Sequence, residues 1–205
     1  AAAAIAEGWR RTAPHDVVVQ VPLADGGPGF LDVLHASLGG ELLALTVTGP
    51  LGDPVPAAVL MLGTTAYVES AQACGLHLVP QAQRDPRVTT TYGVGELLAA
   101  AVDAGARRIV VGLGGSATND AGAGLLAALG ATATAADGSA ATDVLRRGGA
   151  GLRDVAKVDA TAALARVDGV SIVAATDVDN PLLGLRGATN GFGPQKGADQ
   201  AAVML

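Results

Sequence analysis

The sequence contains very little of several residue types that many functional sites require. One cysteine, Cys74, cannot form an internal disulfide framework or a cysteine-based zinc site, and it is consistent with a reducing cytoplasm. Aromatic residues make up 2% of the chain, so its core must be built from Ala, Val and Leu. No apolar run approaches the roughly 20 residues of a membrane-spanning helix. We therefore expect a globular cytoplasmic protein that does not associate with a membrane.

Positive charge is also scarce. The 13 lysines and arginines are outnumbered by 19 aspartates and glutamates, which gives a net charge of −6, and basic residues occur at most in adjacent pairs. A nucleic-acid or anionic-membrane surface normally requires a concentrated basic patch, so neither partner is expected. The opening residues AAAAIAEGWRR place Ile5 and Trp9 four positions apart. They indicate an amphipathic surface helix rather than a signal sequence.

Strand and helix patterns alternate along the chain. Strands are predicted at 16–24, 41–49, 55–62, 65–70, 107–111 and 168–176, and helices at 28–38, 93–106 and around 127–129, with loops and short helices at 136–162. The alternation indicates an α/β protein with a largely parallel sheet. Ligands of such sheets bind at the carboxyl ends of the strands. Three polar loops follow predicted strands there: ADGGPG, GLGGSATND and TDVDNPL.

The loop GLGGSATND (112–120) contains the densest cluster of small and polar residues. Glycines between a strand and a helix present bare backbone N–H groups, which suit a phosphate or a carboxylate. Ser116, Thr118 and Asn119 add side-chain donors. Asp120 would repel an anion unless a cation lay between them, so it suggests Mg²⁺ or a base for a hydroxyl nucleophile. The same residue types also cap helices, and a capped tight turn is the alternative interpretation.

The stretch GLGGSA also fits the dinucleotide pattern G-x-G-x-x-A, so an NAD-binding oxidoreductase domain is an alternative function. That fold requires an acidic residue about 20 positions further on, at the end of a second strand. Asp137 is the nearest candidate, but its surroundings, ATATAADGSAA, make a poor strand. A Walker loop is excluded because no Gly-Lys-Ser/Thr sequence occurs.

The remaining polar loops each have a chemical and a purely structural interpretation. Asp25 precedes paired glycines in ADGGPG, which is also the composition of a simple tight turn. In TDVDNPL, Asp177, Asp179 and Asn180 suit a hard cation, although on these residues alone a turn before the proline is favoured. Lys196, one of two lysines in the chain, lies in FGPQKGA and suits a compact ammonium donor to phosphate.

Four stretches in the same order resemble the type I glycerate kinases: PLADGGPG, TTTYGVGELLAAAVDAGARRIVVGLGGSATNDAGAG, TDVDNPLLGLRGAT and FGPQKGA. The resemblance covers essentially the whole chain. It implies a cytoplasmic kinase that transfers the γ-phosphoryl group of ATP to glycerate with Mg²⁺, giving 2-phosphoglycerate rather than 3-phosphoglycerate. It also implies two α/β domains with a ligand cleft between them. Residues 1–60 would be part of a flavodoxin-like three-layer domain, which in the family a C-terminal segment absent here completes, and 61–205 would form the second domain.

The resemblance also implies roles for individual residues and for partners. Asp120 is the candidate base or metal contact, and Lys196 would neutralise charge on the transferring group. Asp177 and Asp179 are the candidate Mg²⁺ ligands. The other candidates bind phosphate or the glycerate carboxylate or close the substrate end: Asp25, Gly26, Gly27, Gly114, Gly115, Ser116, Thr118, Asn119 and Asn180. The expected partners are the small molecules ATP and glycerate, and a homodimer is left open.

The sequence departs from the family pattern at several positions. Pro28 and Phe30 stand where the family typically has Glu and Thr, Ala121–Gly122 replaces a double glycine, and Thr176 replaces a cysteine. Family members are also nearly twice as long as this chain. A degenerate, non-catalytic kinase fragment is therefore a second alternative function.

Overall fold

The computed structural model describes residues 2–182, 184 and 186–204. The strands are β1 (Glu41–Thr48), β2 (Pro54–Leu62), β3 (Thr65–Glu69), β4 (Arg108–Gly112), β5 (Thr132–Thr134), β6 (Lys157–Asp159) and β7 (Ser171–Ala175). The α-helices are α1 (Ala2–Thr12), α2 (Phe30–Leu38), α3 (Ala71–Cys74), α4 (Tyr92–Asp103), α5 (Ala123–Ala128), α6 (Thr161–Arg166), α7 (Ala188–Phe192) and α8 (Gln200–Val203). Short 3₁₀ helices are η1 (Leu76–Leu78), η2 (Gln81–Gln83), η3 (Thr142–Arg146), η4 (Gly149–Asp154) and η5 (Pro194–Lys196).

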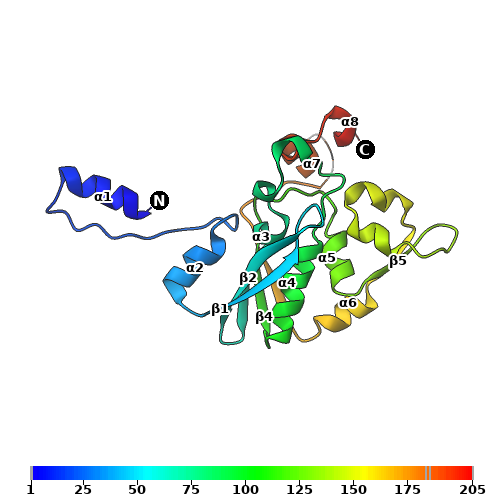
Figure 1. Ribbon diagram of the computed structural model, residues 1–205, viewed down its shortest axis with the longest axis horizontal. Coiled ribbons are helices and arrows are strands. Elements are labelled where there is room, and N and C mark those ends of the chain that lie inside the picture. The colour runs from blue at the N-terminus through cyan, green and yellow to red at the C-terminus, as the bar shows by residue number, and fades with distance from the viewer. Residues whose placement is uncertain (1, 183, 185, 205) are drawn as a thin grey trace.

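A five-stranded sheet with the order β1-β2-β3-β4-β7 forms the centre of the molecule (Figure 1). The pairs β1–β2 and β2–β3 are antiparallel, whereas β3–β4 and β4–β7 are parallel. The parallel part is the part that matters for the site, because the carboxyl ends of β3, β4 and β7 lie at the same edge. The predicted α/β class is confirmed.

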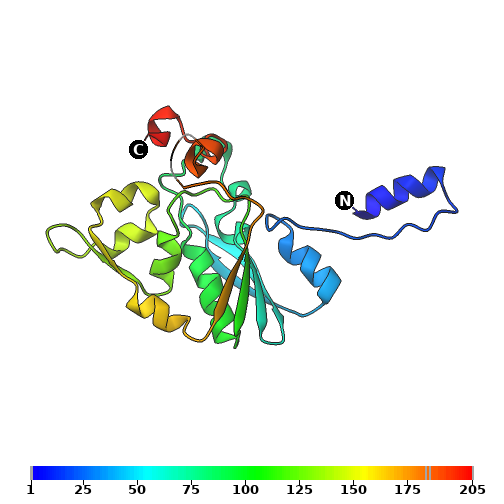
Figure 2. The same ribbon diagram turned by 180° about the vertical axis from the view of Figure 1, so that it is seen from behind.

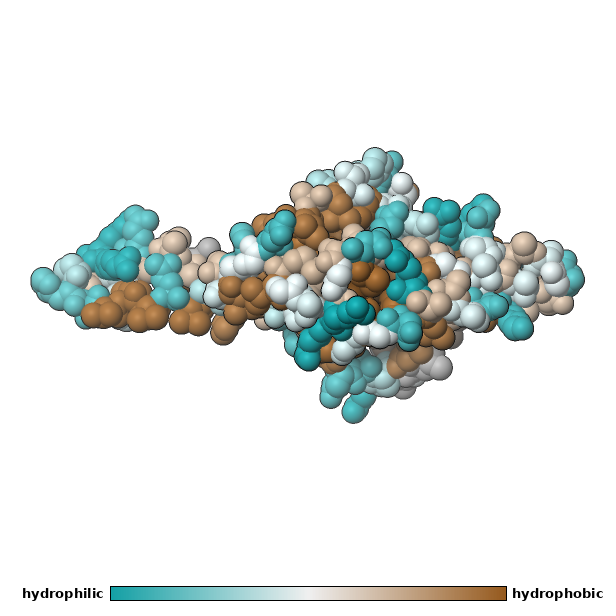
Figure 3. Space-filling model, turned by 90° about the horizontal axis from the view of Figure 1, so that it is seen from below, coloured by the Kyte–Doolittle hydropathy of each residue, from teal (hydrophilic) through white to brown (hydrophobic). Residues whose placement is uncertain are grey.

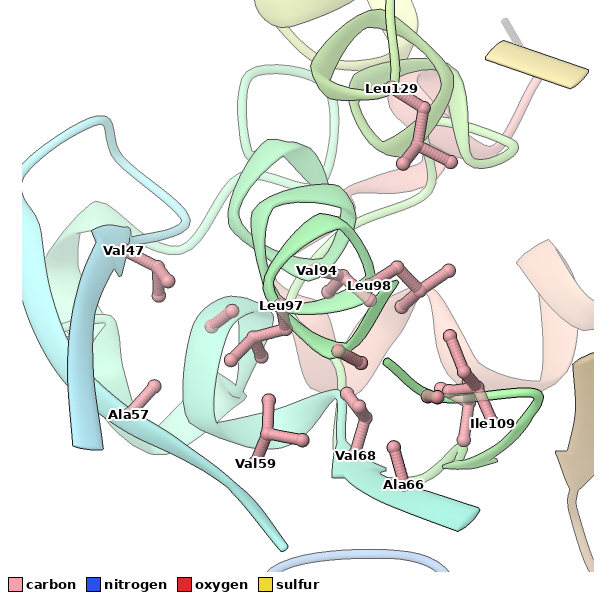
Figure 4. Packing of buried hydrophobic residues seen from close by; sticks show 14 of the residues in the cluster. Val47, Ala57, Val59, Ala66, Val68, Val94, Leu97, Leu98, Ile109 and Leu129 are labelled. Carbon is pink, nitrogen blue, oxygen red and sulfur yellow. The ribbon is translucent and has the colours of Figure 1, made fainter. Parts of the chain in front are cut away.

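The two faces of the sheet are covered by different helices. Val59 faces a core cluster that includes Leu97 of α4, and Figure 4 shows the side chains of that cluster interlocking between helix and sheet. The neighbouring Leu60 belongs to a second cluster with Phe30 and Leu31 of α2. Because successive residues of a strand point to opposite faces, the apolar run in β2 stabilises both layers.

The region after α5 forms a small lobe beside the sheet. The strands β5 and β6 pair antiparallel in a separate two-stranded sheet. Leu145 of η3 is 1% exposed in a cluster with Ala133 and Ala141. The prediction of loops and short helices at 136–162 is confirmed, with β6 as an added element.

The N-terminal segment extends away from the sheet as an arm, which we define as residues 2–24 (Figures 1 and 2). The predicted amphipathic helix is confirmed as α1. The strand predicted at 16–24 is wrong for the described structure, because this segment runs extended without pairing to any described strand. Its alternating pattern leaves a row of aliphatic side chains exposed: Val17, Val19, Val21 and Leu23. Figure 3 shows hydrophobic residues along one side of the arm.

The predicted domain boundary after residue 60 stays a prediction. Within the chain, β2 runs across that position and pairs with β3 on its far side. Among the described residues, no helix has both the length and the apolar character needed to cross a membrane.

Candidate active site at the strand ends

A pocket of about 660 Å³ lies at the carboxyl ends of β3, β4 and β7. Most of the predicted site residues line it: Asp25, Gly27, Gly114, Gly115, Ser116, Thr118, Asn119, Asp120, Asp177 and Lys196. Three predicted residues, Gly26, Asp179 and Asn180, are not among its lining residues. The fold thus brings together residues that lie up to 171 positions apart in the sequence, Asp25 and Lys196.

The two glycine-rich loops pack directly against each other through their backbones. A Cβ atom on Gly114 would lie 2.7 Å from the Cα atom of Gly27. A Cβ on Gly112 would lie 2.7 Å from the carbonyl oxygen of Gly26, and one on Gly26 would lie 2.7 Å from that of Ala175. Real Cβ atoms essentially never approach other atoms this closely. These glycines are therefore required by the contact between the loops, independently of any ligand.

Backbone N–H groups in the middle of the glycine loop remain available to a ligand. Leu113 donates to the carbonyl of Ala175 at 2.9 Å, and Ala117 donates to that of Cys74 at 2.7 Å. Between them, the N–H groups of Gly114, Gly115 and Ser116 donate to no acceptor among the described residues. An oxyanion in the pocket would supply the acceptors that these groups lack.

The loop at Asp25 is held by a carboxylate that sequence reasoning missed. Asp25 Oδ1 accepts a hydrogen bond from the N–H of Gly27 at 2.9 Å, which is the predicted tight turn. Glu69, at the end of β3, is 4% exposed, and its Oε2 accepts from the N–H groups of Gly29 and Leu31, each at 3.1 Å. It anchors this loop and satisfies donors at the start of α2. Its position as a carboxylate at the carboxyl end of a strand was the available signal.

Lys196, at the end of η5, connects this short helix to the loop GLGGSATND. Its Nζ donates to Ser116 Oγ at 3.0 Å, to the carbonyl of Thr118 at 2.7 Å and to Asn119 Oδ1 at 2.9 Å. Burial lowers the pKa of the Lys196 ammonium, whereas the nearby Cys74 and Asp120 raise it. These three hydrogen bonds fix the conformation of the loop, and they place the positive charge of Lys196 at the wall of the pocket.

Thr118 uses its hydroxyl within the protein. The hydroxyl donates to the carbonyl of Thr89 at 2.7 Å, and Thr118 is 5% exposed. Ser116 differs, because its Oγ accepts from Lys196 and its own hydrogen remains available. Of the two predicted hydroxyl donors, Ser116 is thus the better placed to donate to a ligand.

Asp120 connects the beginnings of two helices. Its Oδ2 accepts from the N–H and the Oγ1–H of Thr91, both at 2.8 Å, and from the N–H of Gly124 at 3.3 Å. Its Oδ1 accepts from the N–H of Gly122 at 3.2 Å, and the residue is 1% exposed. These bonds are those of a cap that ties α5 to the start of α4. The predicted role as base or metal contact stays a prediction.

The backbone next to Asp120 is strained. Ala121 has φ = 52°, and it is the one non-glycine residue with positive φ within the described part of the chain. This is one of the two positions where the family pattern has a double glycine. A side chain in the left-handed region costs roughly 1–2 kcal/mol, which glycine avoids.

Only one of the two carboxylates of the loop TDVDNPL lies at the pocket. Asp177 lines it, whereas Asp179 does not, and the amide of Asn180 donates to the carbonyl of Arg186 at 3.4 Å. No group of three or more His, Cys, Asp or Glu side chains suited to a metal exists among the described residues. Mg²⁺ that accompanies phosphates commonly uses only one or two carboxylates. Asp177 beside an anion site fits such an ion; the role of Asp179 stays a prediction.

Several further residues line the pocket without having been predicted, among them Ser70, Cys74, Thr91, Phe192 and Gln195. Ser70 Oγ donates to the carbonyl of Gly112 at 2.8 Å and so supports the end of β4. Burial raises the pKa of the Cys74 thiol to about 12, so the thiol is neutral at physiological pH. Phe192 and Gln195 belong to the same short motif as Lys196, which was the available signal.

The NAD-binding alternative is wrong for this topology. A dinucleotide fold needs the strand after the glycine loop and its helix to lie beside the strand before it. Here β5, which follows α5, pairs with β6 in the separate sheet, and β4 has β3 and β7 as neighbours. Asp137 is exposed and accepts from the N–H of Ser139 at 2.9 Å in a local turn.

Comparison with known proteins agrees with the resemblance seen in the sequence. The chain matches the glycerate kinase family over residues 1–205. It is 46% identical over 200 residues to a glycerate kinase of Bacillus subtilis, covering 97% of this chain and 51% of the relative. It is 43% identical over 205 residues to a glycerate 2-kinase of Escherichia coli, covering 99% and 53%.

A solved structure is similar as well. The crystal structure of a putative glycerate kinase 2 from Salmonella typhimurium superposes with a TM-score of 0.83 at 43% identity. The match covers 98% of this chain and 54% of that one. The chain thus spans about half the length of these relatives. Together, the match along the whole sequence and the shared fold show that the chain belongs to the glycerate kinase family.

Proposed function

We propose that the complete protein is a kinase that transfers the γ-phosphoryl group of ATP to glycerate. The observation that carries this proposal is the juxtaposition, in one pocket, of unpartnered backbone N–H groups and the ammonium group of Lys196. Phosphoryl transfer depends mainly on positioning and on neutralising charge, and these are the groups that do so. Family membership makes glycerate the expected acceptor.

Each part of the pocket then has a role. The N–H groups of Gly114, Gly115 and Ser116, with the Ser116 hydroxyl, bind an oxyanion of the phosphate chain or the glycerate carboxylate. Lys196 supplies positive charge and holds the loop in shape. Asp177 would hold Mg²⁺, which supplies further neutralisation of the phosphates when it is bound.

The acceptor hydroxyl must lose a proton as its oxygen forms the new bond to phosphorus and the bond to ADP breaks. Asp120 was the predicted base, but its two oxygens already accept four hydrogen bonds. Asp25 lines the same pocket, and its Oδ2 has no hydrogen-bond partner among the described residues. We therefore propose that Asp25 accepts the proton and that Asp120 positions the loop.

The test uses the full-length protein with ATP, Mg²⁺ and D-glycerate, with release of ADP as the readout and ³¹P NMR to identify the product. We expect ADP release and 2-phosphoglycerate. Asp25→Asn should lose about 10²–10⁴ in kcat. A protein that binds ATP but releases no ADP with glycerate would support the alternative of a non-catalytic relative instead.

We further propose that the arm belongs to a separate domain of the complete protein, with the boundary near residue 24 rather than 60. Two facts support this: β1 and β2 share the sheet and the core of the remaining chain, while the arm exposes its aliphatic side chains. Limited proteolysis of the full-length protein should then cut near residues 24–25 or after the sheet, and not between β1 and β2. A cytoplasmic location and a homodimer remain proposals, which cell fractionation and sedimentation would check.

A further inference from the structure

A second hollow lies on the other side of the segment that leads into α4. It has a volume of about 530 Å³ and is formed by the turn between β1 and β2, by residues 88–92 and by two arginines, Arg146 and Arg147. No aspartate or glutamate lines it within the described residues. Another pocket of the chain is also lined by two arginines, but one of them, Arg87, is paired with Asp85 at 2.8 Å.

Neither arginine is neutralised within the described structure, and Arg146 is also held in orientation. The Cζ atom of Arg146 lies 4.1 Å from the centre of the Tyr92 ring, a cation–π contact that orients the guanidinium group. The preceding Leu145 is buried at 1% exposure and anchors the backbone of both arginines to the small lobe. Neither arginine forms an ion pair with any carboxylate among the described residues.

We propose that this hollow binds a small phosphate-bearing anion, as a site separate from the active pocket. Two guanidinium groups offer planar arrays of N–H donors to the oxygens of a phosphate. Their two positive charges also attract a phosphate dianion more strongly than a singly charged carboxylate. This proposal does not depend on the proposed kinase activity, because it rests on a different cavity and different residues.

The position of the hollow couples it to the active pocket. Thr90 and Tyr92 line the hollow, whereas Thr91 between them lines the active pocket. The N–H and the hydroxyl of Thr91 both donate to Asp120 Oδ2. An anion that immobilises Arg146 against Tyr92 therefore also immobilises the adjacent Thr91, which donates to Asp120. We expect such an anion to reduce the local unfolding of the backbone at Thr91.

Binding is tested by calorimetric titration of the full-length protein with inorganic phosphate, comparing the parent with the double variant Arg146→Gln/Arg147→Gln. Both side chains are exposed and make no hydrogen bond in the described structure, so the variant should fold. We expect one phosphate-binding event to weaken at least about tenfold, since each charged hydrogen bond contributes that much or more. Arg10→Gln, on the distant arm, is the matched control and should leave the titration unchanged.

Two further measurements keep the result decisive. Acetate should bind this site at least about tenfold more weakly than phosphate, and equal affinity would overturn the assignment to phosphate. Hydrogen exchange of the Thr91 amide should slow with phosphate in the parent but not in the double variant. A double variant that titrates like the parent would overturn the site, and unchanged exchange on binding would overturn the coupling.

Discussion

Asp120→Asn is the substitution for which the structure changes the expectation most. As an isolated helix cap, aspartate is replaced by asparagine at little cost, because both side chains accept a hydrogen bond from the backbone. In the structure, however, both oxygens of Asp120 accept bonds, three on Oδ2 and one on Oδ1. An asparagine can keep the three bonds on one side only by turning its NH₂ group toward the N–H of Gly122.

Two donors would then face each other in a site that is 1% exposed. The lost bond and the buried unsatisfied donors cost about 1–3 kcal/mol. For a chain of this length, each kcal/mol lowers the melting temperature by roughly 2–4 °C. We therefore expect a decrease of about 4–8 °C for a central cost of about 2 kcal/mol.

The assay is thermal unfolding followed by circular dichroism, with Asp177→Asn as the matched control. Asp177 also lines the pocket but is exposed, so its substitution should leave the melting temperature within about 1 °C. If Asp120→Asn melts with the parent while kcat of the full-length enzyme falls at least about a hundredfold, Asp120 is the base that its sequence context suggested, and our structural assignment is refuted.

Four further substitutions or treatments test other parts of the site. Gly114→Ala should destabilise the fold by about 2 kcal/mol or more in urea unfolding, whereas Gly191→Ala, where a Cβ would meet its nearest atom only at 3.8 Å, should be nearly neutral; equal effects would contradict the loop contact. Ala121→Gly should stabilise the protein by roughly 1 kcal/mol, because φ is 52° there, and a loss of stability would argue against that strain. Because the pKa of Lys196 is lowered in the folded protein, the folded state binds fewer protons than the unfolded state as the pH approaches 10.5 from below. The free energy of unfolding of the parent, minus that of Lys196→Met, should therefore rise with pH in this window. A flat difference between pH 8 and 10 would contradict this. Cys74, with a pKa of about 12, should react with iodoacetamide at pH 8 only as fast as the protein opens, and labelling of the native protein at the rate of a free thiol would be inconsistent with its burial.

The features that sequence could predict are those set by local pattern. The alternation of apolar strands and helices places the α/β class and the loops at the strand ends, and most predicted site residues line one pocket as a result. Lys196 was singled out by its rarity and its glycine-rich surroundings. Its partners Ser116 and Asn119 are about 80 and 77 positions away, and no periodicity in the chain specifies such contacts.

The errors and omissions share a physical cause. The alternation at 16–24 is that of a strand, but a strand exists only where another segment supplies hydrogen-bond partners. Glu69 was not singled out, because nothing local to the end of β3 shows that it anchors backbone N–H groups 38 and 40 residues away. The hydrogen bonds that Thr91, 29 positions earlier, donates to Asp120 Oδ2 could not be read from the sequence either, and the predicted role of Asp120 as base or metal contact stays a prediction.

The mutual contact of the two glycine loops has a consequence for protein engineering. The loop around Gly27 could not be replaced by a loop from another protein that carries a side chain opposite Gly114. The loop around Gly114 could likewise not be replaced by one that carries a side chain opposite Gly27. Functional chimaeras must therefore inherit both loops from one parent, even though nearly ninety residues separate them in the sequence.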